Sequence, residues 1–474
     1  MSTFFVDKEG GFSGLCHQFV GLDCTVDGPT IVAGWKFDGK TVRVFGDRLG
    51  VIPLFYLDRG KYFLVSTDLF DLLRSAGEVR LDDAAIAVFL RLGYYVGNTT
   101  PFFNVKRVKA NENIEWRSGV LRCIQERTVR SEQFHGSYSE AVGRFGQLFR
   151  DSIAIRAAKG IGTLPLSGGR DSRHILLELC RQGVPPKRCV TLEDVTANDY
   201  EIASHLTERL GVDLISAKSR CSIFEKEDFK NVLNSCLSNE NGWYFDVLPY
   251  LDGPTFDGLG GDVLSNGLYF SAERNRLVKE NKLRRLAACM LESQNSRLRY
   301  VKDELRMRWS SERAEEILVD ELERHAVSPN PIKSFVFWNR TINEIGLIPA
   351  TMILSRETPQ LPFLDETLLR FLLSLPAGKF GGPGFHDSVI SDSFPAFNDI
   401  PFSEKPMVQK KVHRLSRPAR VGMFWRRLLN RYTEKPRIIF YGGKFLFDGD
   451  ERVLLSPFHD FTPVYEALEF VRKS

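Results

Sequence analysis

The 474-residue sequence lacks several features that would place it in a membrane, secreted or zinc-binding class. No apolar run approaches the roughly 20 residues that a membrane helix requires. The first stretch, MSTFFVDKEGG, has neither a basic start nor a long apolar segment, so a secretory signal is not expected. Eight scattered cysteines include no CxxC pair and have no histidine cluster beside them, which argues against a zinc site. We therefore expect reduced, mostly buried thiols in a cytoplasmic protein without an integral membrane segment.

The sequence also lacks a large excess of one sign of charge. The formal net charge of +4 is small for this length and does not indicate binding to nucleic acid. The sequence contains no GxxxxGK[ST] loop of the kinases and GTPases, no internal repeat and no low-complexity linker. It has instead a globular composition, 43% hydrophobic and 26% charged, in a chain too long for one ordinary core. Two domains are expected.

Residues 30–68 alternate like antiparallel strands and contain the turns DGK and DRGK, which are typical of tight hairpins. Another hairpin is predicted around the Ser-Gly pair at 118–119. The segment DDAAIAVFLRLG predicts a helix that begins at one of its two leading aspartates and ends at its glycine. The chain up to about residue 130 is therefore expected to be mostly β.

The pattern changes after residue 130. Apolar residues at helical spacing in YSEAVGRFGQLFRDSIAIRAA lead into a short buried strand in GTLPLSGG. A helix over 171–182, a strand in RCVTLE, a helix over 198–210 and a strand in VDLISA follow. Strands that alternate with helices predict a parallel sheet with helical crossovers, and helical patterns dominate from 226 to 375. The fold class expected for the chain is α/β.

The stretch TLPLSGGRDSRHILLEL places a glycine-rich loop between a short strand and an amphipathic helix. Backbone N–H groups in such a loop point toward the positive end of the helix. Gly168 and Gly169 allow close approach to an anion, and Ser167 and Ser172 add hydroxyl donors. Bare phosphate would repel Asp171, so a magnesium ion bridging its carboxylate to phosphates accounts for the combination. The loop is predicted to hold pyrophosphate.

These residues resemble the PP-loop signature SGGxDS of the AMP-forming ATP pyrophosphatases. FDGLGGDVLSNG resembles the GxG(A/G)DxxxxG segment of asparagine synthetases, and PQLPFLDETLLRFLLSLP resembles the segment that lines their substrate pocket. FGDRLGVIPLFY, FLRLGYYVGNTTPFFNVKRV and ANDYEIASHLTERLGV also resemble segments of that family, in the same order. The chain thus resembles the asparagine synthetase-like family, whose members include β-lactam synthetase and the lasso-peptide macrolactam synthetase.

The resemblance implies a parallel-sheet PP-loop (HUP-like) synthetase domain with a helical C-terminal part over residues 131–474. A smaller, β-rich, reduced Ntn-hydrolase-like domain over residues 1–130 would precede it. ATP and Mg²⁺ are implied, with Asp171 and Asp262 as magnesium ligands and with Glu357 and Lys405 as catalytic residues. The residues implied to contact ATP and its pyrophosphate are Leu166, Ser167, Gly168, Gly169, Asp171, Ser172, Leu192 and Gly260.

The sequence departs from the family in two places. Ser2 stands where a working glutaminase has its cysteine, and the stretch with the glutamine-binding motifs is missing, so this domain is not expected to release ammonia. In the synthetase pocket, Thr358 aligns with the family's acidic residue and Glu357 precedes it by one place. Val263 replaces the second acid beside the metal ligand, and His386 is the basic residue available where the family has one.

Three functions stay open on the sequence alone. The first is an ATP-dependent, AMP-forming synthetase that joins a small-molecule or peptide carboxylate to an amine other than glutamine-derived ammonia. The second is amidation of a small acid or sugar uronate with ammonia, and the third is a nucleotide-binding pseudoenzyme. The segment 405–437, with eleven Lys or Arg and one acid, is a solvated face or a site for an anionic partner. A partner protein of the same pathway and a homodimer are further expectations.

Several other residues have two interpretations each. Arg170 and Arg173 pair with phosphates or an anionic substrate, or lie on the helix surface. His174 is interpreted as a packed helical side chain rather than a catalyst. Tyr244 and Asp246 reach the pocket or belong to the core, and core packing is the commoner explanation for such aromatic segments.

Overall fold

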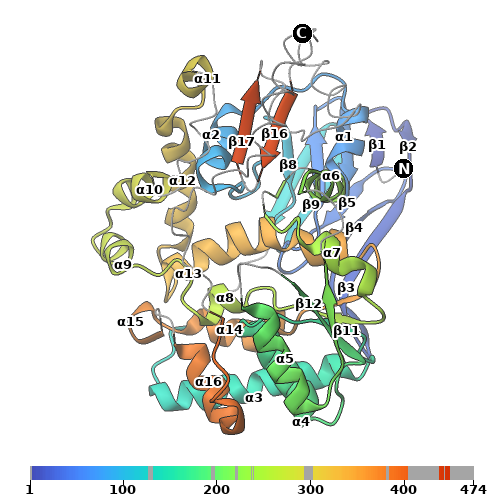
Figure 1. Cartoon of the computed structure of the whole chain (residues 1–474). Helices are drawn as coiled ribbons and strands as arrows, with labels where there is room; N and C mark the ends of the chain where they lie inside the picture. The colour runs from blue at the N-terminus through green and yellow to red at the C-terminus, as the bar shows by residue number, and fades with distance from the viewer. Residues whose placement is uncertain are drawn as a thin grey trace.

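The computed structural model describes residues 3–125, 132–193, 198–218, 223–235, 237–238, 240–292, 303–380 and 384–403, with two later strands at 437–441 and 444–448. It is a mixed α/β structure with two antiparallel sheets, a parallel sheet and a largely helical C-terminal part (Figure 1). The coarse fold class expected from the sequence is confirmed. Domain boundaries at 130 and 131 stay a prediction.

Two five-stranded antiparallel sheets form the N-terminal region. The first has the order β2-β1-β7-β6-β8 and consists of β1 (Thr3–Asp7), β2 (Phe12–Ser13), β6 (Phe55–Asp58), β7 (Tyr62–Ser66) and β8 (Val105–Arg107). The second has the order β10-β9-β5-β4-β3 and consists of β3 (His17–Thr25), β4 (Gly28–Phe37), β5 (Val42–Phe45), β9 (Glu112–Arg117) and β10 (Val120–Gln125). The rings of Phe63 and Trp116 stack across the two sheets with centroids 5.9 Å apart, so both sheets share one core.

The turns and caps predicted for this region are confirmed. The Asp38 carboxylate accepts the backbone N–H groups of Lys40 and Thr41, which closes the β4–β5 hairpin. Helix α2 (Asp83–Leu92) begins at Asp82, whose side chain accepts the N–H of Ala85, and ends at a left-handed glycine. A short helix, α1 (Leu69–Ser75), precedes it. These features are local, which is why sequence patterns located them.

A three-stranded parallel sheet follows, with the order β11-β12-β13. Its strands and the helices around it are α3 (Tyr138–Ala157), β11 (Thr163–Pro165), α4 (Asp171–Arg181), β12 (Arg188–Leu192), α5 (Asp199–Leu210) and β13 (Leu214–Ala217). Farther along the chain, β14 (Thr255–Phe256) and β15 (Pro359–Gln360) pair in parallel. These elements agree with the predicted alternation of strands and helices.

The remaining described elements are mostly helical, as the pattern from 226 to 375 predicted. They are α6 (Ile223–Asn234), α7 (Tyr244–Val247), η1 (Leu248–Tyr250), α8 (Gly261–Ser265), α9 (Ala272–Lys279), α10 (Leu283–Glu292), α11 (Asp303–Arg308), α12 (Ser311–His325), α13 (Pro331–Val336), η3 (Phe337–Ile345), η4 (Ile348–Ile353), η5 (Pro362–Leu364), α14 (Glu366–Ser374), α15 (Ala377–Phe380), α16 (Phe385–Ser393) and η6 (Pro395–Phe397). β16 (Arg437–Tyr441) and β17 (Lys444–Asp448) form a separate hairpin.

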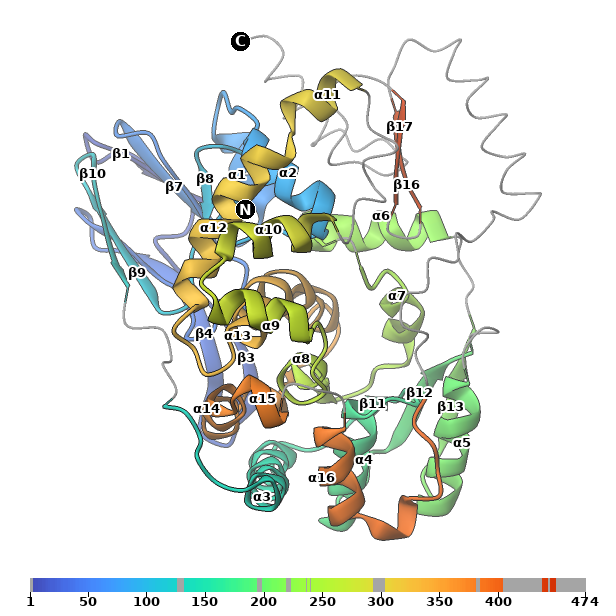
Figure 2. The ribbon, with the colours of Figure 1, turned by 90° about the vertical axis from the view of Figure 1, so that its left-hand side faces the viewer.

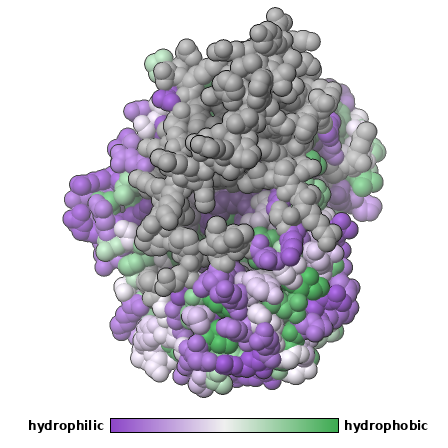
Figure 3. All heavy atoms as spheres, in the orientation of Figure 1, coloured by the Kyte–Doolittle hydropathy of each residue, from purple (hydrophilic) through white to green (hydrophobic). Residues whose placement is uncertain are grey.

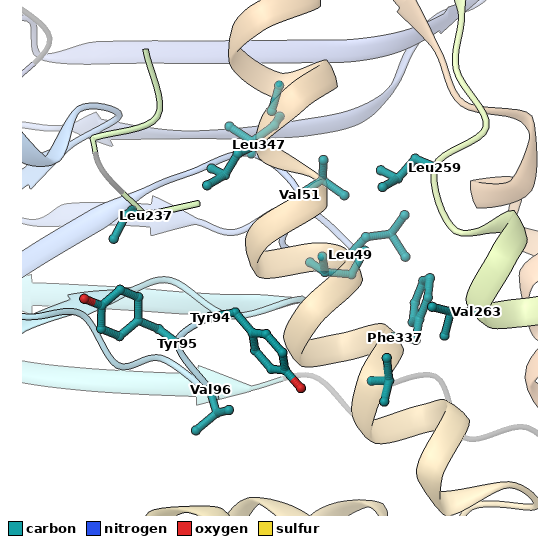
Figure 4. Close-up of a cluster of buried hydrophobic side chains, with 14 of the residues drawn as sticks. Leu49, Val51, Tyr94, Tyr95, Val96, Leu237, Leu259, Val263, Phe337 and Leu347 are labelled. Carbon is teal, nitrogen blue, oxygen red and sulfur yellow. The ribbon is translucent and has the colours of Figure 1, made fainter. Parts of the chain in front are cut away.

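Helices α8, α9 and α13 lie between the antiparallel sheets on one side and the parallel sheet with α4 and α5 on the other (Figure 2). Elements α13 and η3 run through the middle, where Leu49 and Val51 of the N-terminal region approach them from one side (Figure 4). Phe337 packs beside Val263 of α8 (Figure 4). One buried core therefore connects the N-terminal sheets to the segment around α8.

The described surface is mixed in polarity. On the face seen in Figure 3, hydrophilic side chains predominate among the described residues, with smaller hydrophobic areas between them. No helix in the described ranges is long and apolar enough to cross a bilayer. The six described cysteines are free, but only Cys189 is buried and Cys123 is exposed, so the expectation of mostly buried thiols is wrong.

Candidate functional site

The loop between β11 and α4 is held at the end of the parallel sheet. Leu166, which is 3% exposed, donates its N–H to the Val190 carbonyl of β12 at 2.8 Å. Leu192 lies at the end of the same strand β12, beside Ala217 of β13. The loop residues therefore leave the sheet from the carboxyl ends of its strands, which is where α/β sheets place their ligands.

The loop N–H groups already have partners in this structure. Ser167 donates its N–H to Ser172 Oγ at 3.0 Å, and Gly169 donates to Ser167 Oγ at 3.2 Å. The Gly168 N–H donates to Asp199 Oδ1 at 2.8 Å, at the start of α5. The sequence argument expected N–H groups directed at a bound anion. In the structure, the Asp199 carboxylate of the chain itself occupies the place at the Gly168 N–H where a bound anion was expected.

The Asp171 side chain packs closely against the segment before α8. A Cβ atom added to Gly261 would lie 2.4 Å from Asp171 Cγ, and one added to Gly258 would lie 2.8 Å from Asp171 Cβ. Gly260, with φ of 93°, is surrounded instead by apolar side chains. Glycines at 258 and 261 are thus what lets the Asp171 carboxylate reach this backbone. The two aspartates expected at one site, Asp171 and Asp262, belong to adjoining segments.

A third carboxylate, from Asp257, lies in the same region. It accepts the N–H of Leu259 at 2.8 Å and the Tyr244 hydroxyl at 3.3 Å. Burial and then the charges of Asp171 and Asp262 raise the pKa of Asp257 to about 6, against the effect of its hydrogen bonds. Tyr244 therefore reaches the carboxylates. Asp246, the other residue of its segment considered for the pocket, is paired with Lys226.

His386 contacts Asp171 from α16. Its Nδ1 lies 3.4 Å from Asp171 Oδ1 and 3.0 Å from the hydroxyl oxygen of Ser265. Because the Ser265 hydroxyl donates to the Gly261 carbonyl, it accepts from an Nδ1–H of His386. Nε2 of His386 is then the acceptor for Nδ1–H of His174, 3.0 Å away. The imidazole N–H of His386 consequently faces the carboxylate side of the site.

The interpretation of His174 as a packed side chain agrees with its place in the structure. It is fully buried, and its ring lies 4.0 Å from that of Phe149, centroid to centroid. Burial lowers the pKa of His174 well below its usual value, which keeps the imidazole neutral.

Neither interpretation of Arg173 was correct, because its side chain is buried inside the protein. It is 1% exposed and donates to the carbonyls of Ile400 and Pro401. Arg170 is half-buried and forms an ion pair with Asp387 of α16. Both guanidinium groups lie over the ring of Phe402, at 4.6 Å for Arg170 and 4.2 Å for Arg173. The two arginines hold the segment 400–403 against the loop.

Of the two predicted catalytic residues, the structure describes Glu357 but not Lys405. Glu357 is half-buried, just before β15, whose partner strand β14 leads directly into Asp257. The Thr358 carbonyl accepts the N–H of Thr255 at 2.9 Å, so Thr358 joins the same strand pair through its backbone. Lys405 and nearly all of the basic segment 405–437 lie outside the described residues.

The described residues supply no complete protein cage for a metal, since no three His, Cys, Asp or Glu side chains among them converge on one point. Asp171 Oδ1, however, is a buried oxygen atom without a hydrogen-bond partner. Magnesium is commonly held by one or two carboxylates, with water and substrate phosphates as its other ligands. Asp171 and Asp262 fit that mode of binding. Their negative charges also act on the buried Asp257 carboxylate, and acids this close together favour a cation here.

Two contributors were missed by sequence reasoning. Asp257 lies within the quoted segment FDGLGGDVLSNG, but only its spatial neighbours single it out. Asp199 lies within ANDYEIASHLTERLGV, where the sequence indicates only an acidic residue in the first turn of a helix. Its bond to Gly168 spans 31 residues and has no local signal.

Comparisons with known proteins add little to this geometry. No protein-family model matches the chain, and no curated protein matches it. Among solved structures, the glutamine phosphoribosylpyrophosphate amidotransferase from B. subtilis, complexed with ADP and GMP, is similar at 10% sequence identity with a TM-score of 0.15. The match covers 41% of this chain and 49% of that one, about half its length. A likeness this weak supports no argument about fold or function, and the asparagine synthetase-like family stays an inference from the sequence motifs.

Proposed function

We propose that the chain is an ATP-dependent, AMP-forming amide-bond synthetase. It would activate a carboxylate as an acyl-adenylate and pass it to an amine other than glutamine-derived ammonia. The observation that carries the proposal is the contact of Asp171, from the SGGRDS loop, with Gly258 and Gly261 of the FDGLGGD segment. Two motifs that suggested nucleotide chemistry independently in the sequence thus meet at one place.

In this proposal Asp171 and Asp262 hold magnesium, and the loop at 167–169 receives the phosphates. Bound magnesium would neutralise the charge of the triphosphate and of the leaving pyrophosphate. Oδ1 of Asp171 is buried and has no hydrogen-bond partner, so it could bind magnesium without first losing a hydrogen bond. Nδ1 of His386, whose hydrogen is donated to Ser265, lies 3.4 Å from that oxygen, so the imidazole packs beside the carboxylate.

The loop must exchange one internal bond before it receives phosphate. Asp199 occupies the Gly168 N–H, so a phosphate oxygen at this position has to replace that carboxylate. Ser167 and Ser172, whose hydroxyl oxygens lie 3.2 Å apart, can reorient toward phosphate without a backbone change. Catalysis would rest mainly on alignment and charge neutralisation.

The acceptor half of the reaction rests on fewer residues. Glu357 is proposed to orient or deprotonate the amine, because its segment runs beside the strand that ends at Asp257. Lys405 is proposed to neutralise charge that develops at the acyl-adenylate, as its resemblance to the family's lysine implies. The missing glutamine-binding stretch favours an amine supplied by the substrate itself or by a second molecule.

Product analysis tests the reaction type. The protein is incubated with ATP, magnesium and a set of carboxylic acids and amine-bearing peptides, and the nucleotide products are separated. The proposal requires AMP and pyrophosphate with at least one acid, and ADP with phosphate would contradict it. A parallel incubation contains labelled ammonium, and label in the product would establish amidation with ammonia instead. Tight ATP binding with no AMP formed from any acid would indicate a pseudoenzyme.

A further inference from the structure

A cavity lined by none of the residues of the site described above lies between the N-terminal sheets and the helical part. Its volume is about 570 Å³, within the range of pockets that take small molecules. One wall comes from the turn after β5 and from the β8–β9 connection, and the other from α12, α13 and η3. Its charged lining consists of Lys109 on one side and Glu321 and Arg324 on the other.

Hydrogen bonds across the cavity hold its walls in place. Asn339 accepts the Gly97 N–H at 2.7 Å, and Asn343 donates to the Gly97 carbonyl at 3.2 Å. Arg107, which is 4% exposed, donates to the carbonyls of Asn343 and Gly50 at 2.9 Å each. These contacts join the N-terminal region to η3 on either side of the space. The cavity is therefore preformed and does not depend on closure around a ligand.

Among the residues that line the cavity, the cations outnumber the acids by one. Lys109 and Arg324 are basic, and Glu321 is the acid among the lining residues. Glu321 is already engaged by Asn339 at 3.3 Å, His325 at 3.4 Å and Arg324 at 3.5 Å. The Lys109 ammonium makes no ion pair or hydrogen bond with any residue of the described ranges. Burial, and then the charge of Arg324, lowers the pKa of Lys109, while the charges of Glu321 and Glu112 act in the opposite direction.

The lining also contains apolar side chains on both walls. Leu49, Val108, Trp338, Ile342 and Leu373 contribute side chains to it. A ligand that fits this mixture of charged and apolar lining residues has an apolar body and a negatively charged end. A dianion would meet the Glu321 carboxylate at the same rim, so one negative charge matches the excess of one cation.

We propose that this cavity binds a monocarboxylate with an apolar body, its carboxylate held by Lys109 and Arg324 and its body against Trp338 and Ile342. The ligand is either a free acid or the C-terminal carboxylate of a peptide. The site is independent of ATP, since neither nucleotide nor magnesium contacts it in the proposed function.

Calorimetric titration without nucleotide or magnesium tests the site. The probes are phenylacetate and octanoate for a free acid, N-acetylphenylalanine for a peptide end, and the amide of each as its neutral counterpart. The full-length protein should bind at least one carboxylate saturably and its amide about tenfold more weakly or worse, because charge-assisted hydrogen bonds are lost. Lys109→Met and Arg324→Gln should each weaken the binding of that carboxylate by about tenfold and leave the binding of its amide unchanged.

Lys40→Met is the matched control, because Lys40 is exposed in the β4–β5 turn and does not line the cavity. Its affinity for the carboxylate should equal that of the unaltered protein. Equal affinity for acid and amide would overturn the proposal, as would the absence of binding by every carboxylate up to roughly 10 mM. Retained affinity in both Lys109→Met and Arg324→Gln would overturn it too. None of these results bears on the ATP reaction, so the two proposals fail separately.

Discussion

Asp23 and Arg156 form a buried, two-point ion pair, with Nε to Oδ1 and Nη2 to Oδ2 distances of 2.6 Å each. Asp23 Oδ1 also accepts the N–H of Leu361 at 2.8 Å, and Oδ2 accepts the Thr30 hydroxyl at 2.7 Å. The pair thus joins β3 of the N-terminal region to α3 and to the segment before η5. The N-terminal sheets support the segment PQLPFLD directly.

Asp23→Asn should destabilise the folded protein strongly. It removes the two-point partner of the Arg156 guanidinium, which is 1% exposed, and leaves the Asp365 carboxylate 3.5 Å away as its counter-charge. Breaking a buried pair in this way costs about 3–5 kcal/mol. Urea unfolding measures the change. Asp399→Asn is the control, because Arg209 also holds Asp399 by two hydrogen bonds, at 2.6 and 2.7 Å, but on the surface. Equal effects of the two substitutions would mean that burial does not set the strength of the Asp23 pair.

Lys333→Met should stabilise the protein near neutral pH. Lys333 is 4% exposed, donates to the Leu372 carbonyl at 3.1 Å, and has a pKa lowered by burial from 10.5 to about 7. A lysine whose pKa falls on folding destabilises the fold while its ammonium is charged. That cost is complete below pH 7 and fades as the pH rises toward 10.5.

The expected gain for Lys333→Met is about 2–4 kcal/mol at pH 6, shrinking steadily as the pH is raised to 10. Denaturant unfolding at several pH values measures it. Lys279→Met, at an exposed position of α9, should show no such trend. A gain that does not depend on pH would contradict the lowered pKa.

Gly261→Ala should disrupt the proposed site while leaving the fold intact. The new Cβ would lie 2.4–2.7 Å from the carboxyl atoms of Asp171, so that side chain must move. The clash is with a side chain rather than with backbone, and alanine is a better helix former than glycine. Magnesium-dependent ATP binding should therefore weaken by about tenfold or more with little change in unfolding. Gly143→Ala on α3, where a Cβ meets nothing within 4 Å, should leave binding unchanged.

Asp199→Ala should tighten ATP binding several-fold. The substitution frees the Gly168 N–H, which the carboxylate holds at 2.8 Å, and removes a negative charge near the proposed phosphates. Fluorescence titration with a labelled ATP analogue measures the affinity. Weaker binding by Asp199→Ala would show that the carboxylate assists the nucleotide rather than competing with it.

The sequence predicted what depends on neighbouring residues. Asp82 and the glycine after α2 mark the ends of that helix, and the Asp-Gly turns mark the hairpins, because caps and tight turns are set by residues a few places apart. Asp171 and Asp262 were expected together only through the resemblance of their motifs, and the structure places their segments in contact.

Long-range burial could not be predicted in the same way. Arg173 has the spacing of a surface or anion-binding residue, yet Ile400, Pro401 and Phe402 enclose it from more than 200 positions away. Burial is likewise the main cause of the raised pKa of Asp257, with smaller contributions from Asp171, which belongs to a different segment, and Asp262. Periodicity reports which face of an element is apolar, but it does not report which distant polar groups will satisfy a buried charge.

Calorimetric titration of ATP with and without magnesium tests the central claim most directly. The unaltered protein should bind ATP more tightly with magnesium, and Asp171→Asn should bind the magnesium complex about tenfold more weakly or worse. Asp151→Asn, at an exposed position of α3, should match the unaltered protein. The account is contradicted if the unaltered protein fails to bind ATP, or if Asp171→Asn binds its magnesium complex with undiminished affinity.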